Sequence, residues 1–362
     1  MAATVERETD ESRGGPSEPE ILLEFTGRAG EFFRIWIVNL CLTILSLGIY
    51  SAWAKVRTRR YFYSSTLLDG SPFEYTADPK RILIGRMIVL GMALAYSLAG
   101  VFNEWLAVAV AILLFCATPW VVVRSLAFHR RNSRFGNLRF RFSGSYGEAA
   151  KVFIALPIAA SLSLGMLLPW LQGRQQQFIV TNTCYGATRF GFSWRATSYY
   201  GIYLKASGVV LLIVLGLFAL VPIVGLPSLG EDNQFSGPYG MIPLGIAAFL
   251  LILAGTNAVI RAGSTNLLYG NSSLGPNGFR AHLRSTELFG LYATSALAIV
   301  FSLGLAAPWV MVRLARYRVE RIGVIARGDL DDFFQAAEEV HPLGAVAEEA
   351  AGALDFGFDF GL

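Results

Sequence analysis

The chain has 362 residues, of which 54% are hydrophobic and only 15% are charged. Soluble domains usually carry about 25% charged residues, so the composition excludes an ordinary soluble protein and indicates an integral membrane protein. The net charge of +4 conceals a partition, because residues 32–321 hold 26 of the 30 Lys and Arg but nine of the 26 acids, whereas both ends are acidic. The excess of Lys and Arg in residues 32–321 indicates loops that face anionic lipid headgroups. The sequence contains no module that is typical of nucleic-acid binding.

Residues 1–21 are predicted to form a disordered acidic tail, because they are polar and lack the basic and apolar parts of a signal peptide. Seven hydrophobic segments follow, each near the roughly 20 apolar residues that cross a bilayer. Residues 322–362, with one Arg and nine acids, are predicted to form a second acidic tail. The hydrophobic segments are 32–54, 82–101, 105–125, 150–171, 203–226, 241–262 and 288–312.

The connections between these segments show short β signals. Tyr61–Tyr75, with Asp69-Gly70 inside it, is typical of a hairpin, and residues 178–192 look like its counterpart. Leu138–Phe142 alternates apolar and charged residues like an edge strand, and Leu22–Phe25 is its expected equivalent. The predicted fold class is therefore an all-α polytopic membrane protein with six to seven hydrophobic helices, internal repeats and small β-hairpins in its loops.

An internal repeat is the most informative feature of the sequence. Residues 46–61, 163–178 and 302–317 align without gaps on the pattern SLG-xxx-(A/P)-W-xxx-R-xxx-(Y/F), and an acid lies 22 residues before each Trp. We divide the membrane body into repeat unit 1 at 22–137, repeat unit 2 at 138–271 and a truncated repeat unit 3 at 272–321. The candidate structural or functional positions are Glu31, Trp53, Arg57, Glu148, Trp170, Arg174, Glu287, Trp309 and Arg313.

Each class of repeated residue has two interpretations. The Trp residues are interfacial anchors, or they are packing keys at a helix break in the membrane, where freed carbonyl groups could bind an ion. The Arg residues extend to lipid headgroups, or they form salt bridges with the repeated Glu residues. We expect the Glu residues at the membrane boundary near helix N-termini, where the helix dipole favours an acid.

The basic loops leave two arrangements in the membrane open. If all seven segments span, units 1 and 2 are inverted relative to each other, as in known transporters, but some basic loops then face outward. If the three segments that carry the repeated motif instead enter and return, or lie at the cytoplasmic interface, every basic loop and both tails are cytoplasmic, which agrees better with the charge distribution. Only the connections at 101–105 and 225–241 then lie outside.

The sequence contains no recognisable catalytic, cofactor or metal motif, since it lacks a P-loop, a GxSxG elbow and a His pair with metal-ligand spacing. We therefore expect no enzymatic activity, no cofactor and no metal. Two functions remain, namely a transporter or channel-like protein and a non-transporting scaffold that binds lipid or partner proteins. The expected partner is the lipid bilayer with its anionic headgroups; a homo-oligomer is compatible with the sequence, and no substrate is indicated.

The motifs near the start of the chain belong to a wider pattern that comprises Phe25–Phe33, Ser46–Tyr50, Trp53 and Leu68–Tyr75. Together with Phe356–Leu362 at the end of the chain, this pattern resembles the YjgN family of bacterial inner-membrane proteins. The similarity extends over residues 22–320, and it departs from the family pattern at Gln175–Gln177, which replace a basic run. The resemblance implies a bacterial inner-membrane location and no particular activity.

Overall fold

The computed structural model describes residues 20–224 and 242–327, so most of the two predicted acidic tails lies outside the described residues. The strands are β1 (Glu20–Leu22), β2 (Glu24–Phe25), β3 (Thr66–Leu68), β4 (Ser71–Tyr75), β5 (Ser133–Phe135), β6 (Leu138–Phe142), β7 (Thr183–Tyr185), β8 (Thr188–Phe192), β9 (Ser272–Leu274), β10 (Asn277–Ala281) and β11 (Ile322–Ile325). The helices are α1 (Ala29–Leu45), α2 (Ser51–Ser64), α3 (Pro79–Phe102), α4 (Glu104–Arg131), α5 (Tyr146–Ala150), the π-helix η2 (Lys151–Ala155), α6 (Leu156–Leu162), α7 (Leu168–Thr181), α8 (Ala196–Val224), α9 (Ile242–Gly270), α10 (Ser285–Phe301) and α11 (Ala307–Val319).

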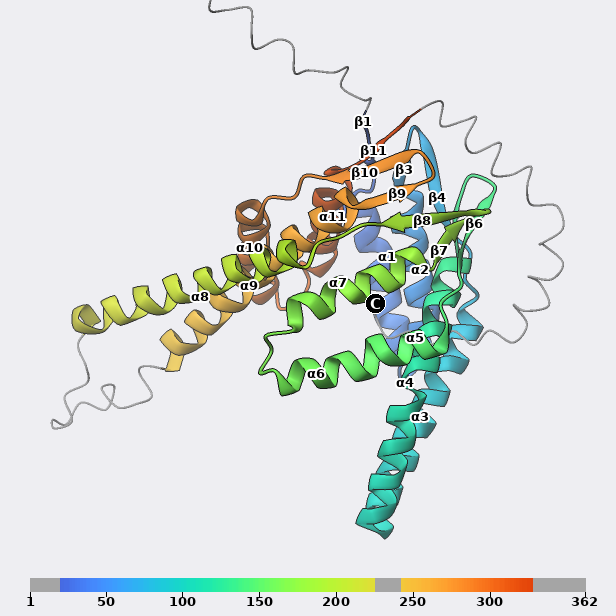
Figure 1. Ribbon diagram of the computed structural model, residues 1–362, viewed down its shortest axis with the longest axis horizontal. Coiled ribbons are helices and arrows are strands. Elements are labelled where there is room, and N and C mark those ends of the chain that lie inside the picture. The colour runs from blue at the N-terminus through green and yellow to red at the C-terminus, as the bar shows by residue number, and fades with distance from the viewer. Residues whose placement is uncertain (1–19, 225–241, 328–362) are drawn as a thin grey trace, which may run out of the picture.

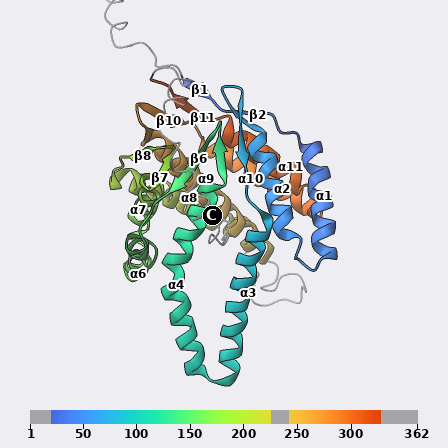
Figure 2. The same cartoon turned by 90° about the vertical axis from the view of Figure 1, so that its right-hand side faces the viewer.

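The eleven strands of the described chain form one antiparallel sheet in the order β1-β11-β10-β9-β8-β7-β6-β5-β4-β3-β2. Its two outermost strands, β1 and β2, are consecutive in the chain and are separated only by Leu23. The segment Glu20–Phe25 therefore pairs with β11 on one side and with β3 on the other, which makes the sheet a nearly closed barrel. Figures 1 and 2 show the strands gathered at one end of the molecule, with the helices extending away from them.

Tight turns build the hairpins of this barrel. The predicted turn at Asp69-Gly70 is present, with φ values of +49° and +73°, and it joins β3 to β4. The turns after β5, β7 and β9 begin with Gly136, Gly186 and Gly275, whose φ values are +54°, +56° and +59°. Glycine adopts this left-handed backbone at little cost, which matches the twist of a short hairpin.

A recurring main-chain hydrogen bond connects the sheet to the helices. Five strands, β2, β4, β6, β8 and β10, each lead into a helix after three residues. At each junction the first residue after the strand donates its N–H to the carbonyl oxygen of the residue that precedes the neighbouring strand, over 2.9–3.1 Å. These five helical pairs therefore leave the same end of the barrel. The bonded pairs are Thr26–Ser65, Thr76–Asn132, Ser143–Asn182, Ser193–Asn271 and His282–Arg321.

Two of the helical pairs are long. Within the described residues, α3, α4, α8 and α9 are the helices long and apolar enough to cross a membrane by length and composition. Only 17–28% of their most apolar stretches is buried inside the protein, which leaves broad apolar surfaces for lipid. Figure 1 shows the pair α3–α4 and the pair α8–α9 extending from the barrel in different directions.

The other three pairs are short, and each reverses direction at the repeated SLG motif. Between α1 and α2, Leu47 has φ +49° and Gly48 has φ +92°. The N–H of Gly48 donates to the carbonyl oxygen of Thr43 at 2.8 Å, which ends α1 as glycine commonly ends a helix. The Ser46 hydroxyl accepts from the N–H of Tyr50 at 2.9 Å. The same left-handed Leu-Gly pair and the same serine bond recur after α6 and after α10.

The predicted fold class of six to seven hydrophobic helices with small hairpins is therefore wrong. Segments 32–54, 150–171 and 288–312 are helix-turn-helix units, because the SLG turn interrupts each of them. The hairpins do not lie separately in the loops but pair with one another in one sheet. An isolated hairpin is only marginally stable and needs further strands, yet pairing between strands far apart in the chain leaves no local sequence signal.

Candidate ligand-binding cavity

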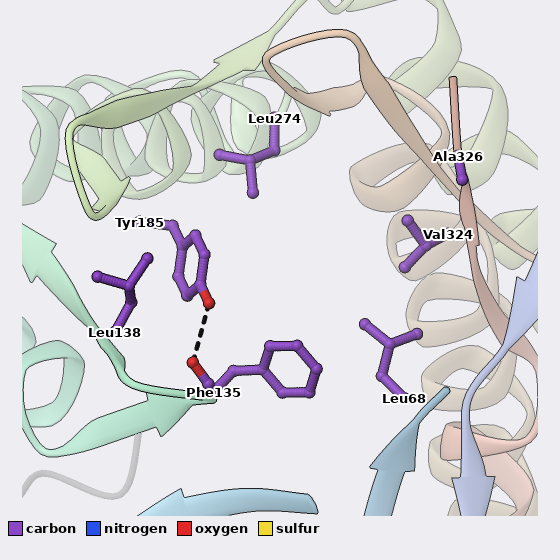
Figure 3. Close-up of a cluster of buried hydrophobic side chains, with 7 residues drawn as sticks. All are labelled: Leu68, Phe135, Leu138, Tyr185, Leu274, Val324 and Ala326. Carbon is purple, nitrogen blue, oxygen red and sulfur yellow. Dashed lines mark hydrogen bonds between the residues drawn. The ribbon is translucent and has the colours of Figure 1, made fainter. Parts of the chain in front are cut away.

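The inner face of the barrel is apolar and largely aromatic. Strand alternation turns one large side chain inward from nearly every strand, while charged neighbours such as Arg139 and Arg141 remain exposed. In Figure 3 the buried side chains at the centre approach one another from strands on different sides of the barrel. They are Leu68, Phe135, Leu138, Tyr185, Leu274, Val324 and Ala326, and Phe73, Phe140, Phe190 and Phe279 pack against them.

These side chains leave a cavity of about 610 Å³. Aromatic pairs from neighbouring strands form its wall, with ring centroids 4.6 Å apart for Phe73 and Phe135 and 5.0 Å apart for Phe140 and Tyr185. The volume lies within the range of about 300–1,000 Å³ that is usual for small-molecule sites, and such sites are mostly apolar. The barrel can therefore hold a hydrophobic ligand.

The C-terminal parts of five helices line the remainder of the cavity. The helices are the second members of their pairs, and α4 and α9 are among the four candidate membrane spans. The cavity therefore lies where the barrel meets the membrane helices. The helical lining residues are Phe62 and Tyr63 of α2, Arg130 of α4, Val180 of α7, Leu268 and Tyr269 of α9, and Ala315 and Val319 of α11.

Most hydroxyl groups on the cavity wall are bonded within the protein. Thr66, Ser133, Thr183 and Ser272 each donate to the carbonyl oxygen four residues earlier, over 2.9, 3.0, 2.7 and 2.6 Å. The Tyr185 hydroxyl donates to the carbonyl oxygen of Phe135 at 2.8 Å, as the dashed line in Figure 3 marks. These groups are satisfied and need no ligand.

Arg130 differs from the other polar groups. It is the one Lys or Arg among the described residues that line the cavity. Its guanidinium makes no hydrogen bond or ion pair with any residue that the structure describes. The titratable groups close enough to interact electrostatically with its guanidinium are Tyr63 and Tyr269, which line the same cavity. Arg130 lies in the last turn of α4, where the negative end of the helix dipole partly stabilises its charge.

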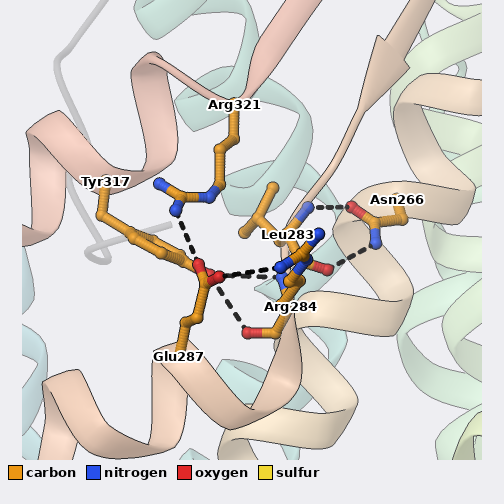
Figure 4. Close-up of polar contacts among 6 residues, drawn as sticks. All are labelled: Asn266, Leu283, Arg284, Glu287, Tyr317 and Arg321. Carbon is orange, nitrogen blue, oxygen red and sulfur yellow. Dashed lines mark hydrogen bonds and ion pairs between the residues drawn. The ribbon is translucent and has the colours of Figure 1, made fainter.

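The repeated acids lie outside the cavity, each in the first turn of a helix. Glu31 is in α1, Glu148 in α5 and Glu287 in α10. Figure 4 shows Glu287 between two arginines, accepting from Arg321 at 2.6 Å and from Arg284 at 3.4 Å. The carboxylate of Glu31 is 3.5 Å from the Tyr61 hydroxyl, and no such partner of Glu148 is found within the described residues.

Tyr61 and Tyr317, the last positions of the repeated motif, bind the start of a helical pair. The Tyr317 hydroxyl accepts from the N–H of Arg284 at 3.2 Å and donates to its carbonyl oxygen at 3.0 Å (Figure 4). Tyr61 makes the same two bonds to Arg28, at 2.7 and 2.8 Å. Burial raises the pKa of both tyrosines above their ordinary value, which keeps the hydroxyls protonated as donors.

The repeated Trp and Arg residues contact each other in two of the three motifs. The guanidinium carbon of Arg174 lies 5.6 Å from the Trp170 ring centroid, and that of Arg313 lies 5.1 Å from the Trp309 centroid, as in cation–π pairs. Arg313 also donates to the Thr294 hydroxyl at 2.8 Å.

In the first motif Trp53 stacks on Tyr50, with centroids 6.2 Å apart, while Arg57 is exposed. Within the described residues, no ion pair joins a repeated Glu to a repeated Arg. The repeated positions therefore make separate contacts, and none of them lines the cavity.

The family of the chain follows from comparison with known proteins. Residues 20–353 match the DUF898 family, described as a bacterial protein of unknown function. The chain belongs to this family. The inner membrane protein YjgN of Salmonella typhimurium is 31% identical to it over 147 residues, which are 40% of this chain and 37% of the relative. The inner membrane protein YjgN of Escherichia coli K12 is 22% identical over 379 residues, which cover 91% of this chain and 94% of the relative.

No solved structure matches this member of the DUF898 family. The predicted YjgN resemblance and the inner-membrane location are confirmed by the named relatives and agree with the four long apolar helices. The family description states no activity, so the function must be inferred from the cavity.

The sequence pattern did not identify the cavity residues. The nine repeated positions are absent from the cavity lining, whereas Arg130 and the inward aromatic residues were not singled out. The available signal was the alternation in Leu138–Phe142 and in Thr188–Phe192, because an aromatic residue at every second strand position indicates an apolar inner face. Arg130 carried no signal, since it lies among several basic residues at the end of a long helix.

Proposed function

We propose that this protein binds a lipid-like molecule, without catalysis, in the cavity of its barrel at the cytoplasmic face of the inner membrane. The observation that carries the proposal is the cavity of about 610 Å³ with an aromatic and aliphatic wall. A cavity of this size and character suits an apolar ligand, because its wall offers dispersion contacts and few polar partners.

The position of the cavity supports a lipid-like ligand over a water-soluble one. The helices α4 and α9 extend from the cavity into the part of the protein that is long and apolar enough to cross a membrane. Apolar molecules are concentrated in the bilayer, so a cavity at the ends of membrane helices meets them at high local concentration.

The charge distribution supports a cytoplasmic barrel. The strands and their turns carry exposed arginines, including Arg139, Arg141 and Arg189, whereas the connection between α3 and α4 at Asn103 contains no Lys or Arg. Basic segments close to membrane helices remain on the cytoplasmic side during insertion. The barrel and the two ends of the chain are then cytoplasmic.

The geometry favours ligand binding over the channel-like function that the sequence also allowed. The two long helical pairs extend from the barrel in different directions (Figure 1), which does not suit a common pathway lined by both pairs. The lipid-interacting alternative needs only the cavity, and we adopt it in the form of an internal binding site.

Photoaffinity labelling tests this proposal. The full-length protein in lipid nanodiscs is irradiated with a long-chain alcohol that carries a diazirine group, and the labelled peptides are identified by mass spectrometry. We expect adducts on the strand residues Phe135, Phe140 and Phe190, which face the cavity.

A cavity-filling variant provides the control. Leu274→Trp should remove the strand adducts, whereas Leu211→Trp, at an exposed position of α8, should leave them unchanged. Val324→Phe serves as a second filling variant, and the melting temperature identifies any variant that fails to fold. Labelling confined to the outer surfaces of α3, α4, α8 and α9, and insensitive to both filling variants, would contradict the proposal.

A further inference from the structure

We infer that the cavity takes a single-chain amphiphile with an anionic head, such as a carboxylate or a phosphate, and that Arg130 holds this head. The inference rests on the proposed function and names its ligand class. It follows from an unpaired cation on the wall of a mostly apolar cavity.

The first argument is the missing counter-charge of Arg130. A guanidinium stays charged at all physiological pH values, and placing it against apolar surface is costly unless it is paired. Within the described residues Arg130 has no hydrogen bond or ion pair, although it carries five N–H donors. The C-terminal end of α4 offsets part of this cost through its dipole but supplies no counter-ion.

The second argument is the geometry of the donor. A guanidinium offers two parallel N–H groups that match the two oxygens of a carboxylate or phosphate. Neutral heads such as alcohols offer one oxygen and no charge, so they leave most of these donors unused. The site therefore distinguishes ligands by the charge of the head.

The hydroxyl of Tyr269 could also bind the anionic head. Tyr269 lines the cavity beside Arg130, and its hydroxyl forms no hydrogen bond within the described residues. Tyr63, the other neighbour of Arg130, already bonds the Ser133 hydroxyl at 3.1 Å. Tyr269 is thus free to donate to an oxygen that Arg130 holds.

The placement of these groups orients the ligand. Arg130 and Tyr269 belong to the ends of α4 and α9, whereas the aromatic wall belongs to the strands. The anionic head then lies at the helix ends, and the chain extends along Phe135, Phe140 and Phe190 into the barrel. A head at one end and an apolar wall beyond it is the arrangement that an amphiphile requires.

Three diazirine probes with the same chain test the inference: a fatty acid, an alkyl phosphate and a fatty alcohol. Each is titrated on the full-length protein in nanodiscs, and the extent of labelling on the strand residues gives an apparent affinity. We expect Arg130→Gln to lower the apparent affinity for the acid, the phosphate or both by about 10- to 100-fold, which is the usual contribution of a charge-assisted hydrogen bond to affinity. The apparent affinity for the alcohol should change by no more than about twofold.

Matched variants separate this effect from a general loss of structure. Arg139→Gln removes an exposed arginine from the outer face of the barrel and should change none of the three affinities. Arg130→Lys should retain part of the preference for an anionic head, because lysine keeps the positive charge but lacks the paired N–H donors of a guanidinium. The acid and phosphate arms show which anionic head the site prefers.

The outcomes distinguish this inference from the proposed function. Equal labelling by acid, phosphate and alcohol, unaffected by Arg130→Gln, would overturn the anionic head and leave cavity binding intact. No strand labelling by any probe would overturn both. If deletion of residues 355–362 increased labelling by all three probes equally, the end of the chain, and not an amphiphile, would be the occupant, and the inference would fail.

Discussion

The N–H of Leu23 donates to the carbonyl oxygen of Ile322 at 2.9 Å, which joins two residues near opposite ends of the chain. On either side of Leu23, β1 pairs with β11 and β2 pairs with β3. One six-residue segment, Glu20–Phe25, thus closes the sheet and leaves neither β3 nor β11 as an open edge. Closure matters because unpaired strand edges expose backbone groups that bind other chains.

The buried hydrogen bond of Tyr185 should contribute to the stability of the barrel. Its hydroxyl donates to the Phe135 carbonyl oxygen at 2.8 Å inside the buried cluster. Tyr185→Phe removes this buried hydrogen bond, so we expect a loss of about 0.5–1.5 kcal/mol in the free energy of unfolding. Denaturant unfolding in detergent measures it, with the exposed Tyr146→Phe as the control. Equal stability of the two variants would show that the bond contributes nothing.

The reversal at the SLG motif should depend on glycine. Gly48 has φ +92°, where a side chain is strained, so Gly48→Ala should lower stability by about 1 kcal/mol. Gly91 lies inside α3 with open space where a methyl group would extend, and Gly91→Ala should be neutral or slightly stabilising because alanine favours helix. Melting temperatures of both variants test the contrast. A Gly48→Ala protein as stable as Gly91→Ala would argue against a left-handed turn at this motif.

The repeated acids should differ in their contribution to stability. Glu287 contacts both Arg284 and Arg321, whereas Glu148 has only the start of its helix as a favourable neighbour within the described residues. We expect Glu287→Gln to cost about 1 kcal/mol and Glu148→Gln about half as much. The difference should diminish at high salt, because ions screen partly exposed pairs. Unfolding curves at low and high salt measure it, and identical losses for both variants would contradict the assignment.

The tyrosines at the helix junctions should make stability depend on alkaline pH. Burial raises the pKa of Tyr61 and Tyr317 above the ordinary 10.0. The unfolded chain therefore loses these protons first as the pH rises, so their contribution is complete below about pH 10 and is lost as the pH passes the folded pKa. The double variant Tyr61→Phe, Tyr317→Phe should show a shallower decline in melting temperature above about pH 10. A decline as steep as that of the natural protein would exclude these two groups as its cause.

The sequence predicted the features that depend on local chemistry. The hairpin turn at Asp69-Gly70, the alternation of Leu138–Phe142 and the helix starts at Glu31 and Glu287 all follow from neighbouring residues, and the structure contains them. The membrane class followed from long apolar runs. The division into units 22–137, 138–271 and 272–321 stays a prediction.

The barrel and its cavity could not be predicted in the same way. Pairing of Phe73 with Phe135, or of Ile21 with Val324, joins strands that are separated by whole helical pairs, and no local pattern records such contacts. The segment 32–54 looked long enough to span a membrane, because hydropathy counts Leu47 and Gly48 as part of a continuous run although both are left-handed. The interior site therefore required the tertiary structure, whereas the repeated motif drew attention to the outer turns.

Disulfide cross-linking between β1 and β11 tests the closed barrel most directly. In a protein whose three cysteines are replaced, Leu22→Cys and Gly323→Cys occupy paired positions, whereas Leu22→Cys and Arg189→Cys lie on strands that are not neighbours. Mild oxidation in membranes should give a fast-migrating, reducible monomer for the first pair and not for the second. Failure of the Leu22–Gly323 pair to cross-link, or equal cross-linking of both pairs, would contradict a barrel in which β1 pairs with β11.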